Sequence, residues 1–141
     1  MHKRIHIPPE QRGQSLVELG ISMIVLLFLL AGAINFGIAF YDYVAITDAA
    51  QEGALYGSID PTNTAGIITR VQLSSSSPVN LSTITPTVST PNGTCPGKPL
   101  TVTLVYYSPV TMPIAGIFTN AIRLTASATS IILKSPTLGC P

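Results

Sequence analysis

Few side chains in this sequence can act as catalysts or ligands. Both histidines, His2 and His6, precede an apolar run that begins at Leu19, so base catalysis downstream of that run has no histidine to use. The acids that follow the run are sparse: Asp42, Asp48, Glu52 and Asp60. No glycine-rich phosphate loop, serine elbow or metal-ligand spacing accompanies them. The sequence therefore predicts a protein that is not an enzyme and that uses no metal and no cofactor.

Glu18 is the acid with the clearest physical consequence, because it lies directly at the start of the apolar run. A charged side chain in a membrane-spanning helix costs up to about 2.5–3.5 kcal/mol at mid-bilayer, so such a residue usually has a partner. The alternative is an acid in the headgroup region, favoured by the positive end of its own helix dipole. The residues alone leave both interpretations open.

Two cysteines, Cys95 and Cys140, lie downstream of the apolar run. An even number of cysteines in an exported region favours one disulfide. That bond would close a loop of about 46 residues and contribute roughly 4 kcal/mol on the chain-entropy model. Two free thiols are the alternative, and a metal site lacks further ligands.

The apolar run has the length of a membrane span. Residues 19–41 carry no charge, and at about 1.5 Å per residue they extend about 35 Å, against a hydrocarbon core of about 30 Å. Lys3, Arg4 and Arg12 precede the run, and the next basic residue is Arg70. The positive-inside rule then places the N-terminus in the cytoplasm and the rest outside. We predict a single-pass protein of the inner membrane, in contact with its lipids.

A cleaved secretory signal is the main alternative for this segment. Leu19 to Leu30 would be its apolar core and Ala31–Ala33 its small-residue cleavage site. Glu18 argues against it, because an acid gives a signal peptide no advantage there. The apolar run also continues past Ala33 without a break.

Residues 42–57 continue the helical pattern outside the membrane. Small or apolar residues recur at the spacing of one helix face: Ala45, Ile46, Ala49, Ala50, Gly53, Ala54 and Gly57. Asp42, Asp48, Gln51 and Glu52 are predicted to lie largely off this face. We expect one helix over residues 14–57, ended by Asp60-Pro61. Its narrow face requires close packing, in part against the chain's own outer domain.

Residues 58–141 are predicted to form a small, exported, β-rich domain. A short helix is expected within 62–74, and an edge strand at most within 79–89, which Pro86 interrupts. Residues 100–107 and 122–133 alternate apolar and polar side chains, which is typical of strands. Residues 114–120 are expected to connect them. The predicted fold is α+β, with a long N-terminal helix packed against a small antiparallel sheet.

Asn35 is an amide within the predicted span. It can hydrogen-bond to a neighbouring helix, for about 0.6–2 kcal/mol, and Ala33 and Gly37 form a small-xxx-small pair that lets such a helix approach. The alternative is an amide near the outer interface, solvated by headgroups.

Charge argues against a nucleic-acid partner. Only 9% of the residues are charged, against roughly 25% in ordinary soluble domains, and the net charge is +1. The basic residues form no stripe outside the N-terminus, so the electrostatic footprint of a nucleic-acid-binding protein is missing.

Residues 12–19, RGQSLVEL, resemble the cleavage region of type IV prepilins. The resemblance implies a cytoplasmic leader, residues 1–13, removed by a prepilin peptidase between Gly13 and Gln14. Glycine before the cut suits a narrow site that accepts extended backbone. Glu18 would then be the fifth residue of the mature chain, with the new N-terminal amine, its own or a neighbour's, as its implied partner.

Over residues 12–57 the sequence is similar to TadE-like proteins of tight-adherence pilus systems. Arg12 through Glu18 match the family pattern, as do Phe40-Tyr41 and the small-residue stretch 47–54. Asn35-Phe36-Gly37 stands where the family usually has an aspartate before phenylalanine and glycine. Ile38 and Gln51 stand where arginines are common. These three residues are uncharged, so they cannot form the ion pairs between helices that charged residues at the same positions could form.

The resemblance implies a pilin or minor pseudopilin of a tight-adherence or type IV-like pilus. Its implied partners are the prepilin peptidase, other pilin or pseudopilin subunits and the pilus assembly platform, and assembly into a filament would make the subunit extracellular. Assembly contacts would involve Glu18, Asn35 and Gly37. The alternative function is an unprocessed single-pass protein of a surface or secretion complex, whose outer β domain binds a partner.

Overall fold

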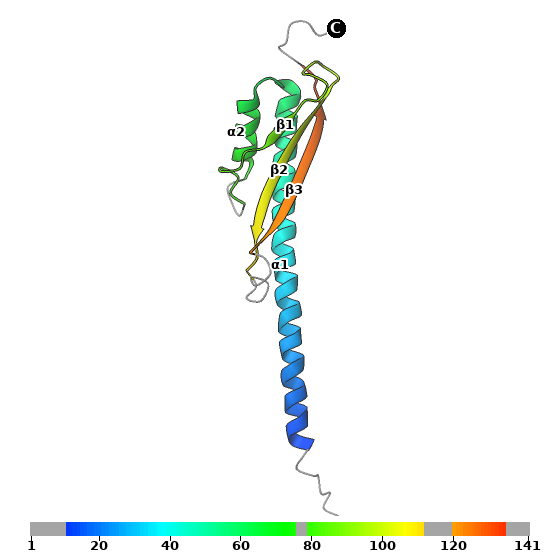
Figure 1. Cartoon of the computed structure of the whole chain (residues 1–141), viewed down its shortest axis with the longest axis vertical. Coiled ribbons are helices and arrows are strands. Elements are labelled where there is room, and N and C mark those ends of the chain that lie inside the picture. The colour runs from blue at the N-terminus through cyan, green and yellow to red at the C-terminus, as the bar shows by residue number, and fades with distance from the viewer. Residues whose placement is uncertain (1–10, 76–78, 112–119, 135–141) are drawn as a thin grey trace, which may run out of the picture.

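The computed structural model describes residues 11–75, 79–111 and 120–134 of the chain, with the side chains of Gln11 and Arg12 excepted. Two helices and a three-stranded antiparallel sheet make up this part. The predicted α+β fold, with a long apolar N-terminal helix and a small antiparallel sheet, is therefore confirmed. The small domain lies along one end of the helix, and the other end projects away from it (Figure 1).

Helix α1 spans Gln11–Ile59, 49 residues, or about 74 Å at 1.5 Å per residue. It is longer than predicted at both ends and crosses the Gly13–Gln14 bond without interruption. At its outer end Asp60 N still donates to the Tyr56 carbonyl, at 3.1 Å. Pro61 follows and cannot continue the helical hydrogen-bond ladder.

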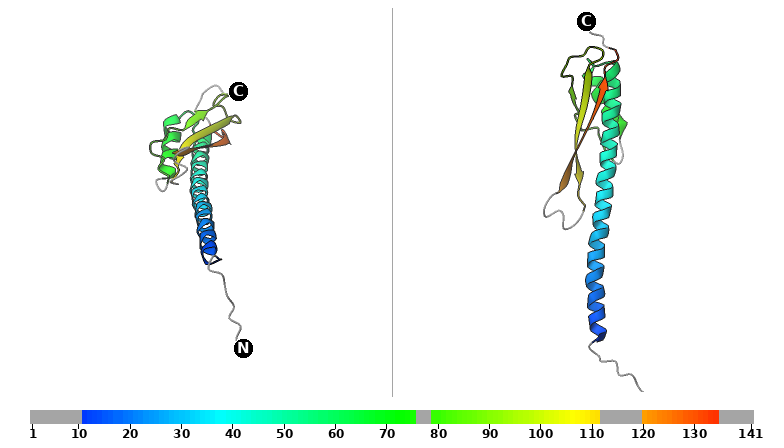
Figure 2. Two further views of the ribbon diagram at one scale, coloured as in Figure 1. Left: turned by 60° about the horizontal axis from the view of Figure 1, so that its bottom comes forward. Right: turned by 90° about the vertical axis from the view of Figure 1, so that its right-hand side faces the viewer.

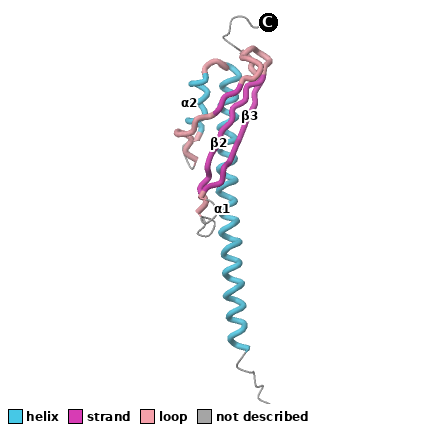
Figure 3. The backbone as a smooth tube through the Cα atoms, in the orientation of Figure 1, coloured by secondary structure: helices cyan, strands magenta, loops and turns pink. Residues whose placement is uncertain are grey.

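Helix α2 spans Thr64–Ser74, within the predicted range. Asn63 caps its N-terminus: the Asn63 Oδ1 accepts from the Gly66 amide at 2.9 Å. Asn63 Nδ2 also donates to the Tyr56 hydroxyl of α1, at 3.2 Å. Asn63 therefore caps the start of α2 and also joins α2 to α1, which lies beside it (Figure 3).

The sheet consists of β1 (Thr87–Ser89), β2 (Pro99–Pro109) and β3 (Ala121–Ile131), in that order and antiparallel throughout. As predicted, the first strand is short and lies at an edge, directly after Pro86. The two long strands pair along their whole length, from Pro99 opposite Ile131 to Pro109 opposite Ala121. Of the predicted connector 114–120, only Asn120 lies within the described residues.

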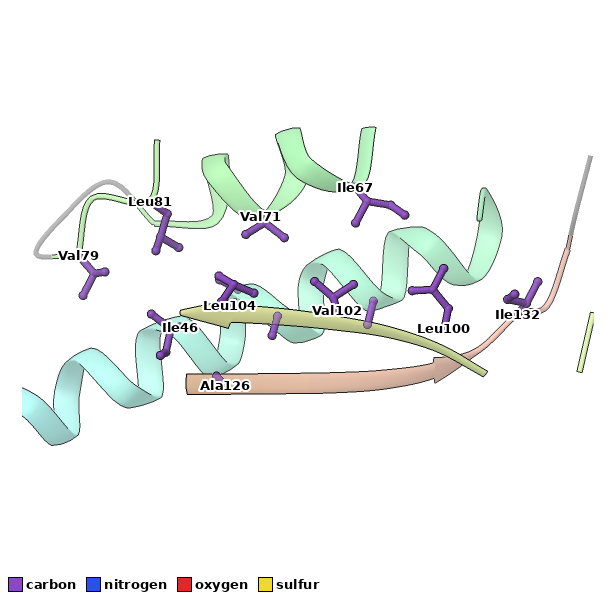
Figure 4. Close-up of a cluster of buried hydrophobic side chains, with 13 residues drawn as sticks. Ile46, Ile67, Val71, Val79, Leu81, Leu100, Val102, Leu104, Ala126 and Ile132 are labelled. Atoms are coloured by element: carbon purple, nitrogen blue, oxygen red, sulfur yellow. The ribbon is translucent and has the colours of Figure 1, made fainter. Parts of the chain in front are cut away.

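The core fills the space between α1, α2 and the sheet (Figure 4). It contains the small-residue face of α1 together with aliphatic residues of the other elements. Its members are Ile46, Ala49, Ala50, Ala54, Ile67, Val71, Val79, Leu81, Leu100, Val102, Leu104, Ala126 and Ile132. The prediction that this helix face packs against the chain's own domain is confirmed.

Two glycines of this face explain how closely the layers approach. A Cβ atom at Gly53 would lie 2.5 Å from Val71 Cγ2 of α2. A Cβ atom at Gly57 would lie 2.8 Å from Leu100 Cδ2 of β2. Real carbon atoms do not pack at such distances, so the bare backbone of α1 is itself part of the contact surface.

Asp42 does not lie off the buried face, and that part of the prediction was wrong. Its side chain is 5% exposed. Asp42 precedes Ile46 by four residues and Gly53 by eleven, so one helix face carries all three. The sequence prediction placed Asp42 off this face because the residue is polar, although its spacing from Ile46 places it on the face.

Candidate functional site

The N-terminal half of α1 has no cover from the rest of the described chain. Every residue from Gly13 to Leu30 is exposed, although nearly all are apolar. Among the described residues, one helix, over residues 13–59, is long and apolar enough to cross a membrane. Such a surface suits lipid or other apolar helices, and it is unfavourable in water.

The residues of the predicted processing site lie at the start of this exposed half. Gly13, Gln14 and Glu18 are all helical and exposed, and nothing lies within 4 Å of a Cβ built on Gly13. Gln14 and Glu18 are four residues apart and therefore share a helix face. Glu18 forms no hydrogen bond or ion pair with another described residue. Room for a side chain at Gly13 means that packing inside this chain does not require glycine there.

Asn35 is hydrogen-bonded to the segment that follows β2. Its Oδ1 accepts from both the backbone amide and the hydroxyl of Thr111, each at 3.1 Å. Its Nδ2 donates to the Ala31 carbonyl, one turn earlier, at 2.9 Å. The amide predicted to meet a neighbouring helix or headgroups thus bonds within the chain. Gly37 points away, with nothing within 4 Å of a Cβ built on it.

A second polar contact joins α1 to β2 at Asp42, seven residues after Asn35. Ser108 Oγ, in β2, donates to Asp42 Oδ2 at 2.6 Å, and Ser108 is 1% exposed. Burial, and secondarily the nearby Asp42 carboxylate, raise the pKa of Tyr106 above its usual 10.0. Sequence interpretation missed this pair; the helical spacing of Asp42 from Ile46 was the available signal.

Cys95 lies between β1 and β2 and is disulfide-bonded. Cys140, the other cysteine of the chain, lies outside the described residues. The pairing of the two therefore stays a prediction.

A charged contact joins the two helices of the described chain. Arg70 of α2 pairs with Glu52 of α1, at 3.5 Å between Nη1 and Oε1, and both side chains are about half exposed. The Arg70 guanidinium also lies 5.8 Å from the centre of the Tyr56 ring. Within the described ranges, no three histidine, cysteine or acidic side chains converge as a metal site. These contacts join α1 and α2.

The exposed and the packed parts of α1 together match a known family. Residues 13–55 match the family model of the TadE-like proteins. This stretch of the chain is similar to the TadE-like proteins. It begins at Gly13 and ends two residues before Gly57, so it contains Glu18, Asn35, Asp42 and the small-residue face except for Gly57. No curated protein and no solved structure matches the chain.

The match to the TadE-like family covers residues 13–55, about a third of the chain. These residues make up most of α1, the helix of the described chain that is long and apolar enough to span a membrane. The sheet lies beyond the matched residues. The family therefore describes the helix, and the outer domain is described by its structure alone.

Proposed function

We propose that this chain is a pilin-like structural subunit, a pilin or minor pseudopilin, of a tight-adherence or type IV-like pilus. A prepilin peptidase removes residues 1–13, and the subunit assembles through the mature N-terminus of α1. The observation that carries the proposal is the exposed apolar half of α1, which has a single acid, Glu18, four residues after Gln14. An apolar helix without internal partners needs partners from outside, and membrane lipids and identical helices both qualify.

Glu18 gives the assembly a defined register. After cleavage the Gln14 amine is one helical turn from the Glu18 carboxylate, so the two charges can meet within a chain or between neighbours. Pairing would offset the cost of a carboxylate in apolar surroundings, which an isolated acid would bear in full. Where the partner amine belongs to a neighbouring subunit, a subunit at the wrong height would leave Glu18 unpaired.

Processing is tested by expressing the full chain with its cognate prepilin peptidase and reading the mature N-terminus by mass spectrometry. We expect a chain that starts at Gln14, and we expect Gly13→Leu to abolish this cleavage. Gly20→Leu is the matched control, because Gly20 also has open space around it and lies in the same helix. An intact Met1 start, or a start at Ile34 from a secretory signal, would contradict the proposal.

Assembly is tested separately with Glu18→Gln, which keeps the size of the side chain and removes its charge. We expect normal cleavage but loss of the subunit from purified pili. Glu52→Gln is the control, since Glu52 pairs with Arg70 in the outer domain. Pili that contain both variants equally would show that Glu18 does not direct assembly.

One observation favours the second candidate, an unprocessed membrane protein with a partner-binding outer domain. Helix α1 begins at Gln11, so the Gly13–Gln14 bond is helical, whereas peptidases generally bind extended backbone. Cleavage therefore requires the first turn of α1 to unwind, for which Gly13 lowers the cost. A chain that keeps residues 1–13 in the presence of the peptidase and is absent from pili would establish this second function.

A further inference from the structure

The lower end of the outer domain is fixed at a definite height along α1. Thr111 bonds to Asn35, and Ser108 bonds to Asp42. Thr111 follows β2, and Ser108 is near its last residue. The described part of the domain therefore ends beside residues 35–42 of α1, and Figure 2 shows the sheet along one end of this helix.

Aromatic side chains gather at this level. Of the eight phenylalanines and tyrosines among the described residues, six lie here: Phe36, Phe40, Tyr41, Tyr43, Tyr106 and Tyr107. All except Tyr106 are exposed, with Phe36 at 74% and Tyr107 at 62%. The four tyrosines, each with an apolar ring and a polar hydroxyl, favour the boundary between hydrocarbon and water, and the two phenylalanines add apolar surface beside them. We name these six residues the aromatic band.

A basic residue accompanies the band. Arg123 of β3 lies directly opposite Tyr107 in the β2–β3 register. It is exposed and forms no ion pair with another described residue. Arginine next to an interfacial aromatic can place its stem among apolar groups and its guanidinium on a phosphate.

The length of helix below the band fits a bilayer. From Gln14 to Ile34 there are 21 residues, which at 1.5 Å each span about 32 Å, and a hydrocarbon core is about 30 Å thick. A span that ended at Tyr41, as the sequence suggests, would place the hydrogen-bonded Asn35–Thr111 contact within lipid and the buried Asp42 directly at its edge. The folded domain excludes that position, because polar, irregular backbone is not tolerated against hydrocarbon.

We propose that the aromatic band and Arg123 form a docking surface for the headgroup layer of the outer leaflet, with an anionic lipid phosphate bound by Arg123. The hydrocarbon span is then residues 14–34. This proposal rests on the membrane anchor of the proposed function. It adds that the outer domain lies directly on the membrane at a fixed height, and that Glu18 enters the inner part of the span.

The chain contains no tryptophan, so single tryptophans can report depth without background. The full chain is reconstituted in vesicles of phosphatidylcholine and phosphatidylglycerol, with bromine at defined depths along the acyl chains. Tyr107→Trp is the reporter of the band, Ile24→Trp the reporter of the span, and Leu55→Trp the control on the same helix, about 20 Å beyond Asp42. We expect shallow bromines to quench Tyr107→Trp, deep bromines to quench Ile24→Trp, and neither to quench Leu55→Trp.

Arg123→Gln tests the phosphate contact in the Tyr107→Trp background. It should reduce shallow quenching in vesicles with phosphatidylglycerol and leave it unchanged in pure phosphatidylcholine. Thr125→Gln, an exposed position on the same strand, is the control that should change neither.

Three outcomes would overturn the docking surface. In the first outcome, no bromine quenches Tyr107→Trp or Leu55→Trp, while Ile24→Trp is quenched. The membrane anchor would then be supported and the docking surface would be refuted. Tyr107→Trp could instead be protected from both bromine and aqueous acrylamide until the protein is diluted in lipid, which would identify a second copy as the occupant. Absence of quenching at Ile24→Trp would remove the membrane anchor itself, together with the proposed function.

Discussion

The two halves of α1 belong to one continuous helix, yet they are stabilised in different ways. The outer half presents a narrow face of alanines and glycines to α2 and β2, and that face is buried. The inner half is apolar on all sides and exposed throughout from Gly13 to Leu30. Small residues permit close packing within the chain, whereas large aliphatic residues without internal partners require lipid or another subunit. The boundary between the halves lies at Asn35–Asp42, where polar contacts fix the domain to the helix.

The largest effect is expected from breaking the packed half at Gly53. Gly53→Leu puts side-chain atoms where Val71 already lies, and the clash should lower the free energy of unfolding of the outer domain by about 3 kcal/mol. Gly20→Leu, in the bare half, should change it by less than about 1 kcal/mol, because only helix propensity is altered. Urea unfolding in detergent, followed by near-UV circular dichroism, measures both. Equal effects would contradict the distinction between the halves.

The next effect is expected at the boundary contact between Ser108 and Asp42. Ser108→Ala leaves the buried carboxylate without its hydroxyl donor and should cost about 2 kcal/mol. Ser127→Ala, on the exposed face of β3, should be nearly neutral. Adding Asp42→Asn to Ser108→Ala should recover part of the loss, since the uncompensated charge disappears. A Ser108→Ala variant as stable as the wild-type chain would show that the bond contributes nothing.

A smaller effect is expected at Asn35, nearer to the bare half. Asn35→Ala removes the acceptor for the amide and hydroxyl of Thr111, with a net cost of about 1 kcal/mol. Its clearest sign is faster hydrogen exchange at the Thr111 amide, with amides in the centre of β2 unchanged. Gln51→Ala, an exposed position of the packed half, serves as control. Unaltered protection at Thr111 would mean that the domain is held at this height by other contacts.

The smallest effect is an alkaline one and concerns Tyr106 of β2, near Asp42 at the boundary. The pKa of Tyr106 is raised in the folded chain by burial and by Asp42, so the folded state keeps this proton to higher pH than the unfolded state. The stabilisation is complete below about pH 10 and is lost as pH rises through the folded pKa. Tyr106→Phe should reduce the slope of the unfolding free energy against pH in this range, and Tyr107→Phe should leave that slope unchanged. Identical slopes in the two variants would exclude Tyr106 as the source.

Local patterns in the sequence predicted most of the fold. The apolar run, the small-residue face of residues 42–57 and the alternation in residues 100–107 and 122–133 each depend on neighbours along the chain, and the structure has helix and strands there. The processing site and the role of Glu18 were inferred from residue types at short spacing. They stay predictions, because a peptidase and neighbouring subunits lie outside a single chain.

Sequence alone determined that one helix carries an apolar surface too extensive for water and a face too small for anything but close packing. Both properties follow from residue type and a 3.6-residue period. Only the tertiary structure decided where along α1 the exposed apolar surface ends and the packed face begins. Asn35 and Asp42 find their partners in Thr111 and Ser108, more than 60 residues away. No local pattern encodes such a pairing, because it depends on the height at which the sheet settles against the helix.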